Sequence, residues 1–171
     1  MPRFCGSFGR CRISYNLAAI HTRAFSGTLA FGPLPLMRES VGDIADWGGT
    51  LVLSVLTEKE IAARGAQLLP TWLVEQGISW LHLPIKDLQA PDMIFEVGWS
   101  SHGKEILYLL QDGEKVLIHC YAGFGRSGTV AARTLIDAGV SVENAIASVR
   151  AARPGAIESR AQEDYLRRCA D

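Results

Sequence analysis

Residues 119–129 read HCYAGFGRSGT, a glycine-rich stretch whose residue types allow two kinds of phosphate chemistry. Its glycines at positions 123, 125 and 128 satisfy G-x-G-x-x-G, the pattern of a dinucleotide-binding loop. Its Cys120 and Arg126 are separated by five residues, the C-x5-R spacing of a loop that transfers a phosphoryl group. The residues around the stretch distinguish between these two kinds of site.

The dinucleotide interpretation requires a second strand that ends in an acidic residue about 20 residues further on, where the carboxylate holds the ribose hydroxyls. Glu143 has about the right separation, but it follows Ser141 at the predicted start of a helix. Everything after Glu143 also reads as helix, and the motif comes too late in the chain to leave room for the remaining strands. The sequence therefore disfavours a dinucleotide site.

The segment between Cys120 and Arg126 is a candidate anion-binding nest. Backbone N–H groups of such a loop converge on one point, and the N-terminus of the following helix adds its positive end. We expect Gly123 and Gly125 to adopt unusual dihedral angles, and Gly128 to allow close packing of the helix start. Arg126 offers a planar fork to two phosphate oxygens. The other predicted phosphate-binding residues are Tyr121, Ala122, Gly123, Phe124 and Gly125.

Cys120 is expected beneath this nest, where the positive field favours a thiolate over a thiol. Such a thiolate would attack phosphorus and hold the phosphoryl group as a thiophosphate ester. A buried structural cysteine is the alternative, but packing explains a cysteine beside a glycine-rich nest poorly. The pattern thus indicates a nucleophilic cysteine whose chemistry needs no metal and no cofactor.

The stretch 119–127 resembles the signature H-C-x-x-G-x-x-R-[ST] of the cysteine-dependent protein tyrosine and dual-specificity phosphatases, and every fixed position agrees. LHLPIKDLQAPD at 81–92 looks like the acid loop of that family, and RPGAIESRAQEDYL at 153–166 looks like its closing segment. The resemblance covers residues 28–168 and is greatest to the kinase-associated phosphatase and small bacterial relatives. It implies hydrolysis of phosphotyrosine, with phosphoserine and phosphothreonine as further candidates, through a phosphocysteine intermediate.

The resemblance and the local sequence together suggest roles for residues around the nest. Ser127 assists departure of the thiolate or caps its helix, and His119 orients the loop. Asp87, directly after a predicted strand, matches the family's general acid, whereas its competitor Asp92 suits a helix N-cap. Gln162 matches the glutamine that positions the hydrolytic water, but the residue also fits a capping box of its own helix.

Strands and helices are expected to alternate along the chain. Short apolar runs predict strands at 51–56, 80–85 and 116–119, with a further short strand from 28. Start and stop signals predict helices at 38–47, from 57 onward, and at 69–76, 93–110, 127–138, 142–153 and 160–169. Glu58 and Glu60, after the first of these strands, either support the site or are solvated acids of a helix start.

This alternation predicts an α/β fold with a central, mostly parallel sheet flanked by helices, of the dual-specificity phosphatase type. In such sheets, ligands bind at the carboxyl ends of the strands. We predict a loosely ordered basic extension at 1–27, with organelle targeting as an alternative, and a catalytic domain at 28–171. No run of eighteen apolar residues offers a membrane span.

Charge and cysteine content limit the partners. A net charge of -1 and scattered aromatic residues give no indication of nucleic-acid binding. Four cysteines without C-x2-C spacing predict neither a zinc site nor a disulfide framework, which suits a reducing compartment such as the cytoplasm. We therefore expect a cytoplasmic monomer that acts on a phosphorylated protein. The alternatives are a phosphoinositide phosphatase and a non-catalytic module that binds phosphoproteins.

Overall fold

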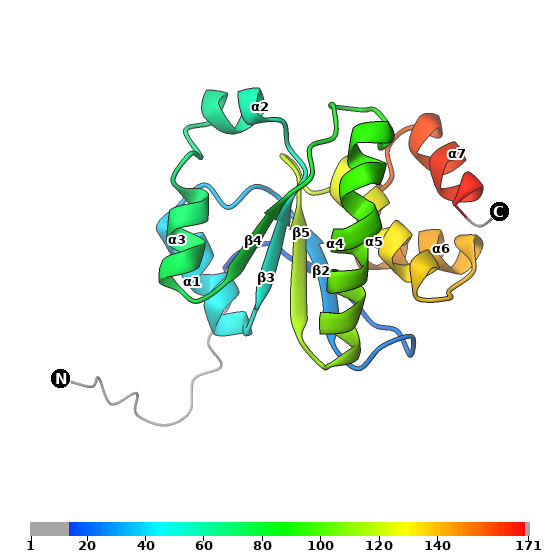
Figure 1. The fold of residues 1–171 in the computed structure, drawn as a ribbon, viewed down its shortest axis with the longest axis horizontal. Coiled ribbons are helices and arrows are strands. Elements are labelled where there is room, and N and C mark those ends of the chain that lie inside the picture. Colours follow the sequence, from blue (N-terminus) through cyan, green and yellow to red (C-terminus); the bar gives the residue numbers. More distant parts are fainter. Residues whose placement is uncertain (1–13, 170–171) are drawn as a thin grey trace.

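The structure is a computed structural model that describes residues 14–169 and arranges them as one five-stranded sheet with helices on both faces (Figure 1). The strands are β1 (Ala18–Ile20), β2 (Thr28–Gly32), β3 (Leu51–Ser54), β4 (Ser79–His82) and β5 (Lys115–His119). The helices are α1 (Arg38–Trp47), α2 (Glu58–Ala63), α3 (Leu69–Glu75), α4 (Met93–Gln111), α5 (Gly125–Asp137), α6 (Val142–Ala152) and α7 (Arg160–Arg168).

The strand order is β1-β2-β5-β3-β4, and every neighbouring pair is parallel except β1 with β2. The predicted α/β fold with a mostly parallel sheet is therefore confirmed. β5 occupies the centre of the sheet, so the loop that follows it begins between the ends of two other strands. None of the helices in residues 14–169 combines the length and the apolar character needed to cross a membrane.

Alternate residues of the central strands face two different layers of helices. Leu53 and Ile118 belong to a core that includes side chains of α4, α5, α6 and α7. Val52 and Leu117 belong to a second core on the other face, with side chains of α1 and α3. Strands buried on both faces need apolar residues at every position, which explains why these strands read as continuous apolar runs.

The sheet begins upstream of residue 28, the expected start of the catalytic domain. β1 pairs with β2 at the sheet edge, and the carboxylate of Asp43 accepts hydrogen bonds from the backbone N–H groups of Ser14 (3.1 Å) and Tyr15 (2.8 Å). The guanidinium of Arg153 donates to the backbone oxygen of Asn16 (2.5 Å). Residues 14–20 of the expected extension are thus attached to the domain, and residues 1–13 lie outside the described residues.

Side-chain caps begin several helices where the sequence predicts them. Thr57 and Glu60 form a reciprocal capping box at α2, and Asp92 accepts hydrogen bonds from two backbone N–H groups at the start of α4. Ser141 occupies the N-cap position of α6 but forms no capping hydrogen bond with its side chain. Helix α5 begins at Gly125 rather than at residue 127, so its first turn belongs to the glycine-rich stretch.

Candidate active site

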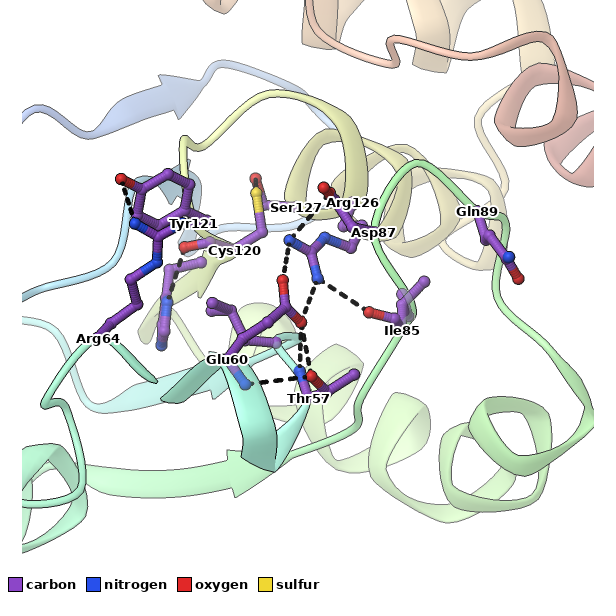
Figure 2. Close-up of polar contacts among 12 residues, drawn as sticks. Thr57, Glu60, Arg64, Ile85, Asp87, Gln89, Cys120, Tyr121, Arg126 and Ser127 are labelled. Carbon is purple, nitrogen blue, oxygen red and sulfur yellow. Dashed lines mark hydrogen bonds and ion pairs between the residues drawn. The ribbon is translucent and has the colours of Figure 1, made fainter. Parts of the chain in front are cut away.

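The carboxyl ends of three neighbouring parallel strands lie side by side at one end of the sheet. A segment of the candidate site follows each of these strands. β5 leads into the cysteine loop (residues 119–127), β3 leads into α2, and β4 leads into the acid loop (residues 83–92). Because β5, β3 and β4 are adjacent in that order, these three segments meet at one place (Figure 2). The site combines residues that are far apart in the sequence.

The sulfur of Cys120 lies beneath the first turn of α5. It accepts a hydrogen bond from the backbone N–H of Gly123 at 3.2 Å, and the hydroxyl oxygen of Ser127 also lies 3.2 Å away. Only 3% of Cys120 is exposed, yet the residue lines a cavity of about 160 Å³. The other lining residues are Asp87, Leu88, Tyr121, Ala122, Arg126, Glu158 and Gln162. Cys120 therefore lines an open pocket, and its sulfur lies within hydrogen-bond distance of one backbone N–H and one hydroxyl.

The glycines of the cysteine loop serve two different purposes. Gly123 has a φ of 81°, and a Cβ there would lie 2.4 Å from the backbone carbon of Gly32. Gly125 does not have a left-handed φ, so the expected unusual dihedral angle is wrong at this position. A Cβ on Gly125 would lie 2.4 Å from a carboxylate oxygen of Glu158, and one on Gly128 would lie 3.1 Å from a neighbouring methyl carbon. Gly125 thus faces the end of a flexible side chain that could move aside, whereas Gly128 lies where the packing is already tight.

Arg126 is held from several sides by neighbours of the cysteine loop. Its Nη1 and Nη2 each donate to one carboxylate oxygen of Glu60 at 2.9 Å, and Nη1 also donates to the backbone oxygen of Ile85 at 3.0 Å. Its Nη2 lies 3.1 Å from a carboxylate oxygen of Asp87. Figure 2 shows this arrangement, in which α2 and the acid loop both reach the guanidinium. The side chain is thereby fixed before any phosphate binds.

Glu60 is a residue of the site that the sequence left undecided. Burial raises the pKa of its carboxyl, but hydrogen bonds from Arg126 and Thr57 outweigh that effect and bring the pKa down to about 2. Glu60 is thus a carboxylate throughout the neutral range and positions Arg126. Glu58 instead lines a separate pocket with residues of α3 and β4. The sequence indicated this role only by the position of Glu60, which lies in the first turn of the helix that follows a central strand.

His119 joins a chain of hydrogen bonds beneath the cysteine loop. Its Nδ1 lies 3.2 Å from the backbone oxygen of Cys120, which can only accept, so Nδ1 carries the proton. Its Nε2 then accepts from the hydroxyl of Ser54 at 2.5 Å, and that hydroxyl oxygen accepts from the indole N–H of Trp80 at 2.8 Å. Burial lowers the pKa of His119 to about 4. This neutral imidazole has no contact with the pocket and orients the backbone at Cys120.

The buried His119 is expected to make folding stability depend on pH. An unfolded histidine binds a proton near pH 6.5, whereas the folded one binds it only near pH 4, so the unfolded state takes up more protons between these values. The free energy of unfolding should therefore fall by about 3 kcal/mol as the pH is lowered from 7 to 4. Urea denaturation at a series of pH values measures this change.

The matched variant for that measurement is His119→Asn, because an asparagine amide keeps a donor near the backbone oxygen of Cys120. Its stability should be lower at pH 7 but should change much less between pH 7 and 4. Parallel pH curves for the wild type and the variant would show that His119 does not carry the effect.

The two candidate acids occupy different environments. Asp87 lies in the acid loop beside the pocket, 70% of its side chain is exposed, and it contacts Arg126. The carboxylate of Asp92 accepts from the backbone N–H groups of Ile94 (3.0 Å) and Phe95 (3.1 Å), as its predicted capping role requires. The structure places Asp87 at the pocket that Cys120 lines and leaves Asp92 at the start of α4. The assignment of Asp87 as the acid remains a prediction that this placement supports.

Gln162 is fully buried and takes part in the capping box that was its alternative role. Its Oε1 accepts from the backbone N–H groups of Glu158 (2.9 Å) and Ser159 (3.2 Å). Its Nε2 donates to the backbone oxygen of Gln89 in the acid loop at 3.3 Å. The same side chain also lines the pocket of Cys120. Gln162 therefore connects α7 to the acid loop, and its action on a water molecule remains a prediction.

A mostly parallel central sheet, a Cys-x5-Arg loop after its middle strand β5 and an acid loop after β4 define a cysteine-dependent phosphatase. Residues 24–166 match the family model described as "PTP-SAK: Swiss Army Knife protein, DSP-PTPase phosphatase domain". The chain belongs to this family, which confirms the resemblance seen in the sequence.

Three curated relatives illustrate the similarity. Protein tyrosine phosphatase type IVA 3 of Bos taurus is 32% identical over 126 residues, which cover 74% of this chain and 67% of that protein. Cyclin-dependent kinase inhibitor 3 of Sus scrofa is 41% identical over 95 residues, covering 54% of this chain and 43% of that protein. The match to protein tyrosine phosphatase domain-containing protein 1 of Bos taurus, at 35% identity, spans only 13% of that protein.

Solved structures of the same family share the fold along most of the chain. Kinase-associated phosphatase, solved with its catalytic cysteine changed to serine, matches with a TM-score of 0.80 at 27% sequence identity. The match covers 89% of this chain and 92% of that one. Tk-PTP in its active form matches with a TM-score of 0.73 at 29% sequence identity. This match covers 90% of this chain and 96% of that one. The expected similarity to the kinase-associated phosphatase is thus confirmed.

Proposed function

We propose that this chain is a protein phosphatase that removes phosphate from phosphotyrosine, and from phosphoserine or phosphothreonine, through a phosphocysteine intermediate. The observation that carries the proposal is the pocket in which the sulfur of Cys120 accepts a backbone N–H at 3.2 Å beside the held guanidinium of Arg126. A nucleophile and a phosphate ligand thus face the same space of about 160 Å³. The family of the chain and its phosphatase relatives support the same activity.

In the first step, the thiolate of Cys120 attacks phosphorus, an S–P bond forms, and the bond to the leaving oxygen breaks. The phosphate oxygens take the place of the Asp87 carboxylate on Nη2 of Arg126, while Glu60 keeps its two bonds to the guanidinium. Asp87, released from Arg126, takes up a proton from solvent and donates it to the leaving oxygen. Charge on the phosphoryl oxygens is stabilised by Arg126 and the N–H groups of the loop.

In the second step, water attacks phosphorus, the S–P bond breaks and inorganic phosphate leaves. Asp87, now a carboxylate, accepts a proton from the attacking water. The Ser127 hydroxyl, 3.2 Å from the sulfur, donates to the departing thiolate. Gln162 lies where its amide contacts both the acid loop and the pocket, which supports a part in positioning this water.

Asp87→Asn is expected to lower kcat for a phosphotyrosine peptide by the 10²- to 10⁴-fold that loss of a general acid typically costs. The loss should be smaller for p-nitrophenyl phosphate, because p-nitrophenolate leaves without a proton more readily than a tyrosine side chain does. The basic limb of the pH–rate profile should also be lost, since a general acid must keep its proton to act and the variant has no such group. Steady-state kinetics on both substrates across pH measures these effects.

Asp92→Asn is the matched control for that experiment. Asparagine caps helices about as well as aspartate, so α4 should keep its start and the variant its stability. Its kcat should stay within about threefold of the wild type, well below the range for loss of a general acid. A larger loss in Asp92→Asn than in Asp87→Asn would transfer the acid role to Asp92.

The substrate class is tested by phosphate release from phosphotyrosine, phosphoserine and phosphothreonine peptides and from phosphoinositides, with Cys120→Ser as the blank. We expect release from the peptides, with phosphotyrosine fastest. Release from phosphoinositides alone would replace the proposed activity by lipid dephosphorylation. Tight peptide binding without release would indicate a non-catalytic module.

A further inference from the structure

Arg64, at the C-terminal end of α2, lies against the cysteine loop from outside the phosphate pocket. Its Nη1 donates to the hydroxyl of Tyr121 at 3.0 Å, and its guanidinium carbon lies 3.7 Å from the centre of the Tyr121 ring. Tyr121 directly follows Cys120 and lines the pocket. Figure 2 shows Arg64 and Tyr121 on one side of Cys120 and Arg126 on the other. Arg64 thus holds a positive charge at the rim of the pocket.

This charge has no anionic partner within residues 14–169. No ion pair involves Arg64 there, whereas Arg126, Arg133 and Arg150 each contact a carboxylate. A guanidinium has five N–H donors, and the hydroxyl of Tyr121 is the only acceptor for the Arg64 side chain in the described part of the chain. Arg64 is exposed, so its other donors are available to a ligand.

The stacking on Tyr121 restricts this exposed side chain. A guanidinium above an aromatic ring gains cation–π attraction, and here a hydrogen bond to the hydroxyl of the same tyrosine adds a second contact. An ordered guanidinium loses less conformational freedom when it binds a carboxylate or a phosphate than a freely moving one would. The geometry therefore suits recognition of an anion that is bound next to the phosphate in the main pocket.

We propose that Arg64, supported by Tyr121, forms a second anion subsite that selects substrates carrying another negative group near the phosphorylated residue. The ligand is a carboxylate of a flanking acidic residue or a second phosphate on the same peptide. This inference rests on the proposed protein phosphatase function and specifies its substrates. Arg64 acts on binding, because it lies outside the pocket in which the sulfur and the leaving oxygen meet.

The test compares three phosphotyrosine peptides of equal length, with neutral flanks, with acidic flanks, and with neutral flanks plus a nearby phosphothreonine. Tyrosine dephosphorylation is followed by mass spectrometry at low and high salt. At low salt, the wild type should favour one or both anionic peptides over the neutral one by about threefold to tenfold in kcat/KM. Preference for the doubly phosphorylated peptide alone identifies a phosphate as the ligand of Arg64. Preference for both anionic peptides shows that a carboxylate also binds there.

Arg64→Ala should remove the preference, and Arg64→Glu should reverse it, so that the neutral peptide becomes the better substrate. High salt should weaken the wild-type preference. Arg38→Ala is the matched control, because it removes an exposed arginine on α1, and it should retain the wild-type ratio. Equal ratios in the wild type and Arg64→Glu would overturn the subsite while leaving the phosphatase intact. Hydrolysis of none of the three peptides would overturn the proposed function itself.

Discussion

Replacing Cys120 by serine is expected to lower kcat for p-nitrophenyl phosphate by on the order of 10⁴- to 10⁶-fold, the scale seen when a catalytic nucleophile is removed. A serine hydroxyl is a much weaker nucleophile than the sulfur of a cysteine, on which the proposed first step depends. The N–H of Gly123 and the hydroxyl oxygen of Ser127, each 3.2 Å from the sulfur, would surround an oxygen atom that attacks phosphorus far less readily. The first chemical step is therefore lost.

Substrate binding should survive this change, because the groups that bind phosphate are the guanidinium of Arg126 and the N–H groups of the loop. Equilibrium binding of a phosphotyrosine peptide to Cys120→Ser should give an affinity within about tenfold of the wild-type KM, a change of at most about 1.4 kcal/mol. The matched control is Cys169→Ser, since Cys169 lies at the end of α7 and contacts Arg133 instead of the pocket. Turnover by Cys120→Ser at the wild-type rate would exclude the thiolate mechanism.

The architecture was largely predictable because its elements carry local signals. Strands buried on both faces need uninterrupted apolar runs, and helix starts show capping residues such as Thr57 and Asp92. The cysteine loop was predictable for a related reason: the curvature of the nest requires Gly123, and its chemistry requires Cys120 and Arg126 at a fixed separation. These requirements all act within a few residues of one another.

Features that depend on contacts distant in sequence were not predictable. β1 has only three residues, and it is held by β2 and by contacts of its flanking residues with Asp43 and Arg153. The sequence of residues 14–20 gives no local signal of these contacts. The bidentate contact between Glu60 and Arg126 joins residues on different elements, because β3 and β5 happen to be neighbours. The placement of Arg64 on Tyr121 follows from the same adjacency.

The position of Gln162 shows why two interpretations of one residue need not exclude each other. A capping box uses the amide oxygen of Gln162, which accepts from the backbone of Glu158 and Ser159. The amide nitrogen points the other way, to Gln89 in the acid loop. Sequence spacing detects the cap, since its partners lie within four residues. It cannot detect the contact with the acid loop, since that depends on how α7 packs against the rest of the domain.

Arg126→Lys is expected to lower kcat/KM by roughly 10³- to 10⁵-fold, the range over which an arginine stabilises charge on a transferring phosphoryl group. Lysine keeps the positive charge but cannot bridge two oxygens in one plane. In this site the difference is large, because both terminal nitrogens of Arg126 are needed to hold Glu60 at 2.9 Å while Nη2 also faces the pocket. Kinetics on a phosphotyrosine peptide measures the loss.

The informative comparison is with Glu60→Gln and Arg133→Lys. Glu60 contacts the guanidinium and not the substrate, so Glu60→Gln should cost far less, about tenfold, through poorer positioning of Arg126. Arg133 lies on the same helix α5 and pairs with Glu96 and Asp137, so Arg133→Lys should reduce thermal stability and leave kcat nearly unchanged. A loss in Arg126→Lys no greater than that in Arg133→Lys would mean that Arg126 holds the fold and not the phosphate. The expected ranking, Arg126 far above Glu60 and Glu60 above Arg133, follows from their contacts. Arg126 lines the pocket, Glu60 contacts Arg126, and Arg133 pairs with carboxylates elsewhere.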